Sequence, residues 1–422
     1  MTPEVKKRIE QIRQGIVPEG YKKGKIGIVP IKWNEVPFST LFTSTSEYTD
    51  DLKQYPLYSL TIEDGITAKT ERYERSHLVK KENSYKVVRP NDYAYNPMNI
   101  RFGAVARHKG DIPVAVSGYY DIFTTVHESD LVFMDSFLTY GPMITYYNKV
   151  STGSLVEKQR VHFSDFLEFS LALPPLEERK KIAEILSTQD KAIELQARKI
   201  EELKRFKKGC LEKMFPRKGQ KVPEKRFPGF TDDWEQRKLS GLIIEYKETV
   251  DSDCDLPVLT SSKTEGIVLQ EEHFGRKQQH DITGYNILPR GYCTYRNRSD
   301  GADFTFNINK CCDKGIISKF YPVFYGNNID VFFISLVLNH SEEVVHEIGY
   351  TCTGTGQKVL SFLDLQKMHI TVPSYAEQKK ISSYFEQLNR LITLHQRKLE
   401  EMKKQKKALM QLLLTGIVRV KA

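Results

Sequence analysis

Two groups of polar side chains in this sequence have the chemistry needed to contact DNA. Arginine and asparagine can each form paired hydrogen bonds with a base, to guanine and adenine respectively, and lysine and arginine bind phosphate. The groups fall in predicted loops between strands, interleaved with aromatic residues. The candidate DNA-binding residues are Asn99, Arg101, Arg107 and Lys109 in the first half and Arg296, Asn297, Arg298 and Lys358 in the second. The alternative interpretation is that most of them are solvated loop charges.

Motifs for catalysis are weak by comparison. The segment 354–358 (Gly-Thr-Gly-Gln-Lys) lacks the glycine spacing of a phosphate-binding loop, so a turn is the better interpretation. The segment 96–99 (Asn-Pro-Met-Asn) lacks the second proline and the aromatic residue of an amino-methyltransferase motif. The 10 histidines and 6 cysteines form neither an HExxH motif nor a CxxC pair. We therefore expect no catalytic residue, metal site or cofactor in this chain, and reduced thiols.

Length and composition set the class of protein. A chain of 422 residues, with 40% hydrophobic and 11% aromatic residues, can build two or three domains with their own cores. A net charge of +9 fits an anionic partner such as DNA without requiring one. The longest apolar run, around residues 331–334, is too short to span a bilayer, and the N-terminus does not have the pattern of a signal peptide. A cytoplasmic protein without membrane partners is expected.

The elements that must position these loops occur twice. The segment 174–182 (PPLEERKKI) is repeated 199 residues later as 373–381 (PSYAEQKKI), and the pairing continues without a gap to Phe215 against Leu414. The β-rich segments that precede these helices are related more distantly, most clearly as 116–123 against 317–324. A period of this length is too long for a solenoid and indicates a duplicated module that ends in a long helix.

Both helices carry a seven-residue hydrophobic repeat that is interrupted at Lys207 and Lys406. Two such stripes favour pairing of the helices with each other, and roughly forty residues at 1.5 Å per residue make a rod of about 60 Å. The alternative is that each helix packs only on its own domain. The predicted helix-pairing residues are Ile182, Ile193, Ile200, Leu203, Ile392, Leu399, Met402 and Leu409.

The predicted fold class is α+β with an internal pseudo-two-fold repeat: two mixed, β-rich domains and two long helices. A first domain over 1–173 begins with a helix at 3–14 that is capped by Thr2. A helix at 174–215, a basic linker at 216–226 and a second domain at 227–373 follow, before a helix and tail at 374–422.

The repeated helices and the segment 226–235 (RFPGFTDDWE) resemble the conserved regions of the specificity subunits of type I restriction–modification systems. The resemblance covers essentially the whole chain, and its most specific feature is the duplicated order of domain, helix, domain, helix. One departure is that the first domain begins with 20–25 (GYKKGK) and has no copy of the RFPGF segment.

This resemblance implies that each β-rich domain is a target-recognition domain for one half of a bipartite double-stranded DNA sequence. It implies that the two helices form an antiparallel coiled coil, set the spacing between half-sites and dock two methyltransferase subunits, which restriction subunits join. The chain itself would be non-catalytic. AdoMet, ATP and Mg²⁺ would be bound by the partners that methylate adenine and cut DNA. Two alternatives remain: a protein-interaction scaffold that does not bind DNA, and a recognition subunit for a fused nuclease–methyltransferase.

Overall fold

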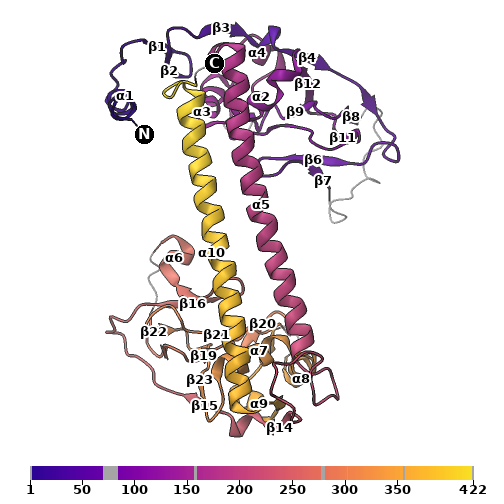
Figure 1. Cartoon of the computed structure of the whole chain (residues 1–422), viewed down its shortest axis with the longest axis vertical. Helices are drawn as coiled ribbons and strands as arrows, with labels where there is room; N and C mark the ends of the chain where they lie inside the picture. The colour runs from indigo at the N-terminus through magenta and orange to yellow at the C-terminus, as the bar shows by residue number, and fades with distance from the viewer. Residues whose placement is uncertain are drawn as a thin grey trace. The chain divides into compact units, whose positions relative to one another are not determined.

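A computed structural model describes residues 2–69, 84–155, 159–276, 281–301, 303–354 and 357–420. The chain divides into two compact units, Met1–Ala197 with Arg397–Ala422 and Arg198–Gln396, called here unit 1 and unit 2. The boundaries fall within the two long helices, α5 (Leu176–Met214) and α10 (Tyr375–Leu414). Each unit therefore contains one β-rich domain and part of both long helices (Figure 1).

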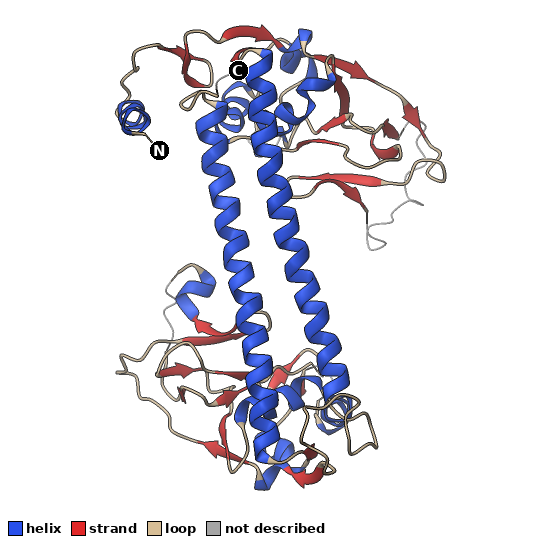
Figure 2. Cartoon of the chain, in the orientation of Figure 1, coloured by secondary structure: helices blue, strands red, loops and turns tan. Residues whose placement is uncertain are grey.

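Both domains are built from short strands and short helices (Figure 2). The elements of domain 1, in unit 1, are α1 (Pro3–Arg13), β1 (Tyr21–Gly24), β2 (Gly27–Pro30), β3 (Asn34–Pro37), η1 (Phe38–Thr40), β4 (Phe42–Thr45), β5 (Tyr48–Thr49), β6 (Tyr58–Thr61), β7 (Gly65–Ala68), β8 (Tyr85–Val88), β9 (Tyr93–Tyr95), η3 (Ile100–Phe102), β10 (Val105–Arg107), β11 (Val114–Ser117), β12 (Asp121–Thr125), η4 (Glu128–Asp130), α2 (Leu131–Phe137), α3 (Gly141–Val150), α4 (Phe163–Leu167) and β13 (Ser170–Leu173).

The elements of domain 2, in unit 2, are β14 (Glu235–Lys238), η6 (Leu239–Gly241), β15 (Ile243–Tyr246), β16 (Leu259–Ser262), β17 (Gly266–Leu269), α6 (Gln270–Phe274), β18 (Asn286–Pro289), β19 (Cys293–Thr294), β20 (Arg298–Ser299), β21 (Asn307–Ile308), β22 (Lys314–Ile317), β23 (Val323–Gly326), α7 (Val331–His340), α8 (Glu342–Thr351), β24 (Lys358–Val359), α9 (Phe362–Lys367) and β25 (His369–Val372). The mixed fold class predicted from the sequence is thus confirmed.

The two domains share one scaffold. Domain 1 has a four-stranded sheet of order β10-β9-β12-β4, and domain 2 has the corresponding sheet β21-β19-β23-β15. A buried tyrosine occupies the equivalent position in the two sheets. The Tyr95 hydroxyl donates to the Val161 carbonyl at 2.8 Å, and the Tyr295 hydroxyl donates to the Leu360 carbonyl at 3.1 Å. The duplication read from the helices therefore extends through the sheets.

Aromatic residues fill the core of domain 1. Phe42 lies with its ring centroid 5.3 Å from that of Phe38 and 5.0 Å from that of Phe123, both in edge-on geometry. Phe38 also meets Phe166 at 5.1 Å. Such pairs add to the free energy gained by removing large rings from water. The core thus fixes the sheet from which the candidate DNA-binding loops emerge.

Inside each unit, the beginning of one long helix packs against the end of the other. In unit 1, Ile182 and Leu186 of α5 share a hydrophobic cluster with Leu413 and Leu414 of α10. In unit 2, residues near the end of α5 share a cluster with residues near the start of α10, among them Leu211, Met214, Ile381 and Phe385. The helices therefore pair antiparallel within each unit.

The eight predicted helix-pairing residues are all removed from full solvent exposure. Ile182, Ile200 and Ile392 are buried, and Ile193, Leu203, Leu399, Met402 and Leu409 are half-buried. A polar contact accompanies the stripe in unit 1, where the Lys406 Nζ lies 2.5 Å from the Asp190 Oδ1. Hydrophobic spacing thus selected residues that are shielded from solvent, and pairing of each of them with the other long helix stays a prediction.

A buried glutamate near the start of each long helix ties the helix to a distant segment. Glu377 accepts two hydrogen bonds of 2.7 Å from Arg226, which opens the RFPGF segment. Glu178 accepts bonds of 2.6 and 2.7 Å from Arg419, which follows α10. Paired, charge-assisted bonds of this kind hold geometry tightly, and a carboxylate is favoured in the first turn of a helix.

In unit 1, Arg419 makes the contact that Arg226 of the RFPGF segment makes in unit 2. The chain after α10 supplies the arginine, and the Tyr21 hydroxyl donates to the Gly416 carbonyl at 2.8 Å. Gly416 has φ of +70°, and a Cβ there would lie 2.5 Å from the Pro30 ring. Only glycine fits this turn without strain.

At the N-terminus, the Thr2 hydroxyl accepts from the Val5 N–H at 3.4 Å, so the predicted cap is present. Among the described residues, no helix has an apolar stretch long enough to cross a bilayer.

Candidate nucleic-acid interface

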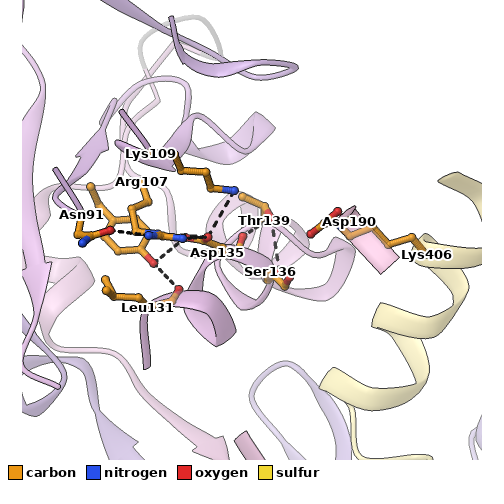
Figure 3. A network of polar contacts seen from close by, with 10 residues as sticks. Asn91, Arg107, Lys109, Leu131, Asp135, Ser136, Thr139, Asp190 and Lys406 are labelled. Carbon is orange, nitrogen blue, oxygen red and sulfur yellow. Dashed lines mark hydrogen bonds and ion pairs between the residues drawn. The ribbon is translucent and has the colours of Figure 1, made fainter. Parts of the chain in front are cut away.

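In domain 1, Arg107 at the end of β10 is held in an internal network (Figure 3). Its Nε and Nη2 lie 2.9 and 2.8 Å from the two carboxylate oxygens of Asp135 in α2, and its Nη1 lies 2.6 Å from the Asn91 Oδ1. Burial lowers the pKa of Arg107, but its hydrogen bonds to Asp135 and the charge of that residue outweigh burial, so the pKa is raised. The guanidinium is thus occupied by protein partners.

Two other side chains meet the same carboxylate. The Tyr93 hydroxyl donates to the Asp135 Oδ1 at 2.8 Å, and the Lys109 Nζ lies 3.5 Å from Oδ2. Burial raises the pKa of Tyr93, and the charge of Asp135 raises it further, so the phenol stays protonated as a donor. Lys109 is mostly exposed and therefore keeps access to solvent.

A surface cavity of about 630 Å³ lies beside this network in unit 1. Arg107, Lys109 and Lys406 line it, together with Asp135 and the β6–β7 hairpin. Each of the three cations is close to a carboxylate: Arg107 and Lys109 to that of Asp135, and Lys406 to that of Asp190. None of these three cations in the cavity wall is therefore unpaired.

The other two candidates of domain 1 lie at η3. Arg101 is buried, with its Nη1 2.6 Å from the Gln159 Oε1 and its guanidinium carbon 4.7 Å from the centroid of the Phe102 ring. Asn99 precedes η3 and is exposed. A base contact by Arg101 would require breaking its bond to Gln159, whereas Asn99 can reach a ligand without such rearrangement.

In domain 2, the structure brings all four candidates together. Strand β20 pairs with β24 in the register Arg298↔Val359 and Ser299↔Lys358, which places Lys358 beside the segment 296–298. Arg296 and Arg298 are exposed, and Lys358 is half-buried. The pairing of two very short strands could not be foreseen from the sequence.

Asn297 has a different character from its neighbours. Its N–H donates to the Phe320 carbonyl at 2.9 Å, and its carbonyl accepts from the Leu360 N–H at 3.0 Å. Its side-chain Oδ1 is buried and has no hydrogen-bond partner among the described residues. The main chain of Asn297 thus joins the β22–β23 turn to the end of β24.

Phe320, in the turn between β22 and β23, belongs to this cluster and was absent from the predicted set. The guanidinium carbon of Arg298 lies 4.5 Å from the centroid of the Phe320 ring, and the Lys319 Nζ lies 5.9 Å from it. Phe320 remains 37% exposed. The repeat contained a signal for this residue, because Tyr119 holds the matching position in 116–123 and is also exposed.

The cations of this domain 2 cluster are Arg296, Arg298, Lys319 and Lys358. Within the part of the chain that the structure describes, no hydrogen bond or ion pair occupies any of these four side chains. Such a group can bind phosphate oxygens and base edges, and an aromatic ring beside it can contact a base.

The sequence and fold were compared with those of known proteins. The family model described as the type I restriction modification DNA specificity domain matches residues 135–205 and 231–404. The chain is 24% identical to a putative type I restriction enzyme MjaX specificity subunit of Methanocaldococcus jannaschii, over 99% of this chain and 93% of that protein. It is 27% identical to the type I restriction enzyme MjaVIII specificity subunit of the same organism, over 61% of this chain and 64% of that one.

Solved structures show the same fold. The S subunit of a type I restriction-modification system from M. genitalium aligns with a TM-score of 0.55 and 11% identity, over 93% of this chain and 99% of that one. A chain from a study of assembly and conformational transition of the type I R-M system aligns with a TM-score of 0.52 and 15% identity, over 92% and 99% of the two chains. With the family model matching more than half of the chain, this protein belongs to the type I restriction modification DNA specificity domain family.

Proposed function

We propose that this chain recognises a bipartite double-stranded DNA target and directs methylation and restriction by partner subunits. Each β-rich domain reads one half-site. One observation carries the proposal. The two domains share the same scaffold, as the equivalent bonds of Tyr95 and Tyr295 show, but they present different polar groups on their loops. A reader of two unlike half-sites needs this combination, whereas a scaffold for two identical partners does not.

Bipartite reading has a physical advantage. A domain that contacts only a few base pairs binds weakly alone. Joining two such domains makes the second contact intramolecular and raises its effective concentration, provided that the half-sites are correctly spaced. The net charge of +9 is modest for a DNA-binding chain of this length. Phosphate contacts supply much of the affinity for DNA, and methyltransferase partners would share them.

The proposed partners are two methyltransferase subunits, held by the long helices, and the restriction subunits that join them. In this assembly AdoMet, ATP and Mg²⁺ belong to the partners, and this chain supplies recognition and spacing. The alternative is a protein-interaction scaffold that does not bind DNA. Binding of the co-expressed complex to its target duplex should weaken steeply with rising salt. Absent or salt-insensitive binding would favour the scaffold.

A domain exchange tests the modular part of the proposal. Replacing residues 38–169 by the matching segment of a relative leaves Trp33 and the β3–β13 pair in place, so the attachment to Glu178 is preserved. Sequencing of methylated motifs in cells should show one half-site changed and the other unchanged. A change in both half-sites, or in neither, would contradict one domain reading one half-site.

An insertion tests the spacing role of the helices. Seven residues added after Ala197 and seven after Gln396, where both helices cross a unit boundary, preserve the hydrophobic repeat. Each helix lengthens by about 10 Å at 1.5 Å per residue, equivalent to about three base pairs at 3.4 Å each. The gap in the methylated motif should widen accordingly with both half-sites retained. An unchanged gap would show that the helices do not set it.

A further inference from the structure

We propose that Arg298 and Phe320 act together to read one thymine–guanine step in the half-site of domain 2. This inference rests on the proposed function and adds to it a pair of specificity-determining residues and the bases that they recognise. In this pair, the edge of the Arg298 guanidinium bonds to guanine, and the Phe320 ring contacts the methyl group of the adjacent thymine.

The first support is the availability of Arg298. It is exposed, and no described residue forms a hydrogen bond or ion pair with its side chain. By contrast, Arg290 in the same domain bonds to Asp313 at 2.7 Å, and Arg226 bonds to Glu377. A guanidinium with free donors is the group that forms paired bonds to the O6 and N7 of guanine.

The second support is the orientation imposed by Phe320. The Arg298 guanidinium carbon lies over the ring, 4.5 Å from its centroid, so stacking limits the rotation of the long side chain. The turn is fixed in its place, because the Asn297 N–H donates to the Phe320 carbonyl at 2.9 Å. A guanidinium held in advance loses less conformational entropy on binding.

The third support is the separation of the two groups. A distance of 4.5 Å is close to the base-pair rise of about 3.4 Å, so a guanidinium level with one base pair leaves the ring near the level of the next. Thymine is the natural base that presents a methyl group in the major groove, and phenylalanine is among the side chains that contact it. The pair is therefore suited to guanine with a neighbouring thymine.

Two further exposed cations lie near this pair. Lys319 is exposed beside the same ring, and Arg296 is exposed on the adjoining segment. Both are suited to phosphate contacts, which position the protein but carry little sequence information. Domain 1 has no equivalent pair, because Met98 stands at the position that matches Arg298 when the two buried tyrosines are aligned.

The test uses the full chain with the methyltransferase subunit of its own system, and begins with the wild-type complex. A bipartite methylated motif in the wild type supports the proposed function whatever the variants do. A complex without any methylated motif would overturn that function and this inference together. A methylated motif whose domain 2 half-site has no guanine next to a thymine would overturn this inference and leave the proposed function intact.

Arg298→Lys keeps the charge and removes the planar fork. We expect the guanine position to become degenerate, binding to the original sequence to fall about 10- to 100-fold, and the domain 1 half-site to stay unchanged. An unchanged motif, or an equal loss on every sequence tested, would overturn base reading, because uniform loss indicates a phosphate contact. Lys314→Gln is the matched control: Lys314 is an exposed cation of β22, and its replacement should leave the motif intact.

Phe320→Ala is tested on duplexes that carry either thymine or uracil next to the guanine. The wild-type complex should prefer thymine by about fourfold, the value for one buried methyl group, and the variant should bind both duplexes equally. Phe320→Leu keeps apolar bulk and should retain part of the preference. A preference that survives intact in Phe320→Ala would overturn the role of the ring. Thermal unfolding checks that each variant is folded.

Discussion

The two domains differ in whether the positively charged residues of their loops have partners within the protein. In domain 1, Arg101, Arg107 and Lys109 each contact a described polar side chain. In domain 2, the side chains of the cluster formed by Arg296, Arg298, Lys319 and Lys358 have no such partner among the described residues, although the sheet beneath them matches that of domain 1. One scaffold therefore supports two loop surfaces with different electrostatic character.

The scaffold can tolerate this divergence because its stability comes from elsewhere. Buried tyrosines, aromatic rings and glutamate clasps hold each unit together, and exposed substitutions away from them usually change stability by less than about 0.5 kcal/mol. Recognition surfaces can thus vary while the fold is retained.

The glutamate clasps also differ between units. Glu178 accepts from the Trp33 Nε1 at 3.2 Å in addition to Arg419. In unit 2, the Trp234 Nε1 is buried without a hydrogen-bond partner among the described residues. Arg226 is only 12% exposed, whereas Arg419 is 34% exposed. Although Glu178 has one more hydrogen bond to lose, Arg226 is the more deeply buried arginine, so loss of the carboxylate should destabilise unit 2 more.

The largest expected effect follows from that difference. Glu377→Gln should lower the free energy of unfolding of unit 2 by about 3–5 kcal/mol, because the buried Arg226 loses the charge of the carboxylate that it bonds to. Glu178→Gln should lower that of unit 1 by less, since Arg419 can regain water. Denaturant unfolding with a fluorescence probe in each unit measures both. Glu201→Gln, at an exposed helix position, is the control, with an expected change below about 0.5 kcal/mol. Equal losses in the two units would show that the clasps are equivalent.

The next effect separates the two groups of arginines. Arg107→Met should destabilise unit 1 by about 2–3 kcal/mol, because the mostly buried Asp135 loses its main partner. Arg296→Met should change the stability of unit 2 by less than about 0.5 kcal/mol and weaken DNA binding instead. Unfolding curves and binding to the target duplex are measured for both variants. Loss of binding with full stability in Arg107→Met would contradict its structural role.

The smallest effect concerns Lys207 and Lys406, the two lysines that interrupt the hydrophobic repeat of the long helices. Lys406 pairs with Asp190, but Asn389 holds the position that matches Asp190 in the repeat. Lys207 is half-buried, and burial lowers its pKa. Between the lowered pKa of Lys207 in the folded chain and its ordinary pKa in the unfolded chain, the unfolded chain binds more protons. The free energy of unfolding should therefore rise as pH increases toward the ordinary lysine pKa of about 10.4.

Lys207→Met should remove this pH dependence, and Asn389→Asp should reduce it by supplying a counter-charge. The expected difference is below about 1 kcal/mol, as for other partly exposed ion pairs. Chemical unfolding of unit 2 at a series of alkaline pH values measures it. A pH dependence that is unaltered in Lys207→Met would assign the titration to another group.

Much of the architecture was predictable from sequence because it depends on periodic patterns. The repeat offset of 199 predicted the duplication, and the seven-residue stripes contain Ile200 and Ile392, which are buried in the structure. The site was less predictable. The sequence suggested Arg107 as a DNA contact but gave no sign that Asp135 would bind it, since the two residues lie on different elements.

The sequence by itself determined that this chain is a duplicated module with two long amphipathic helices, because hydrophobic spacing and repetition are local properties that survive divergence. Only the tertiary structure decided which cations are neutralised within the protein and which remain available. That outcome depends on distant pairings, such as β20 with β24 and Arg419 with Glu178. Electrostatic interactions act between groups brought together by folding, and separation along the chain does not predict them.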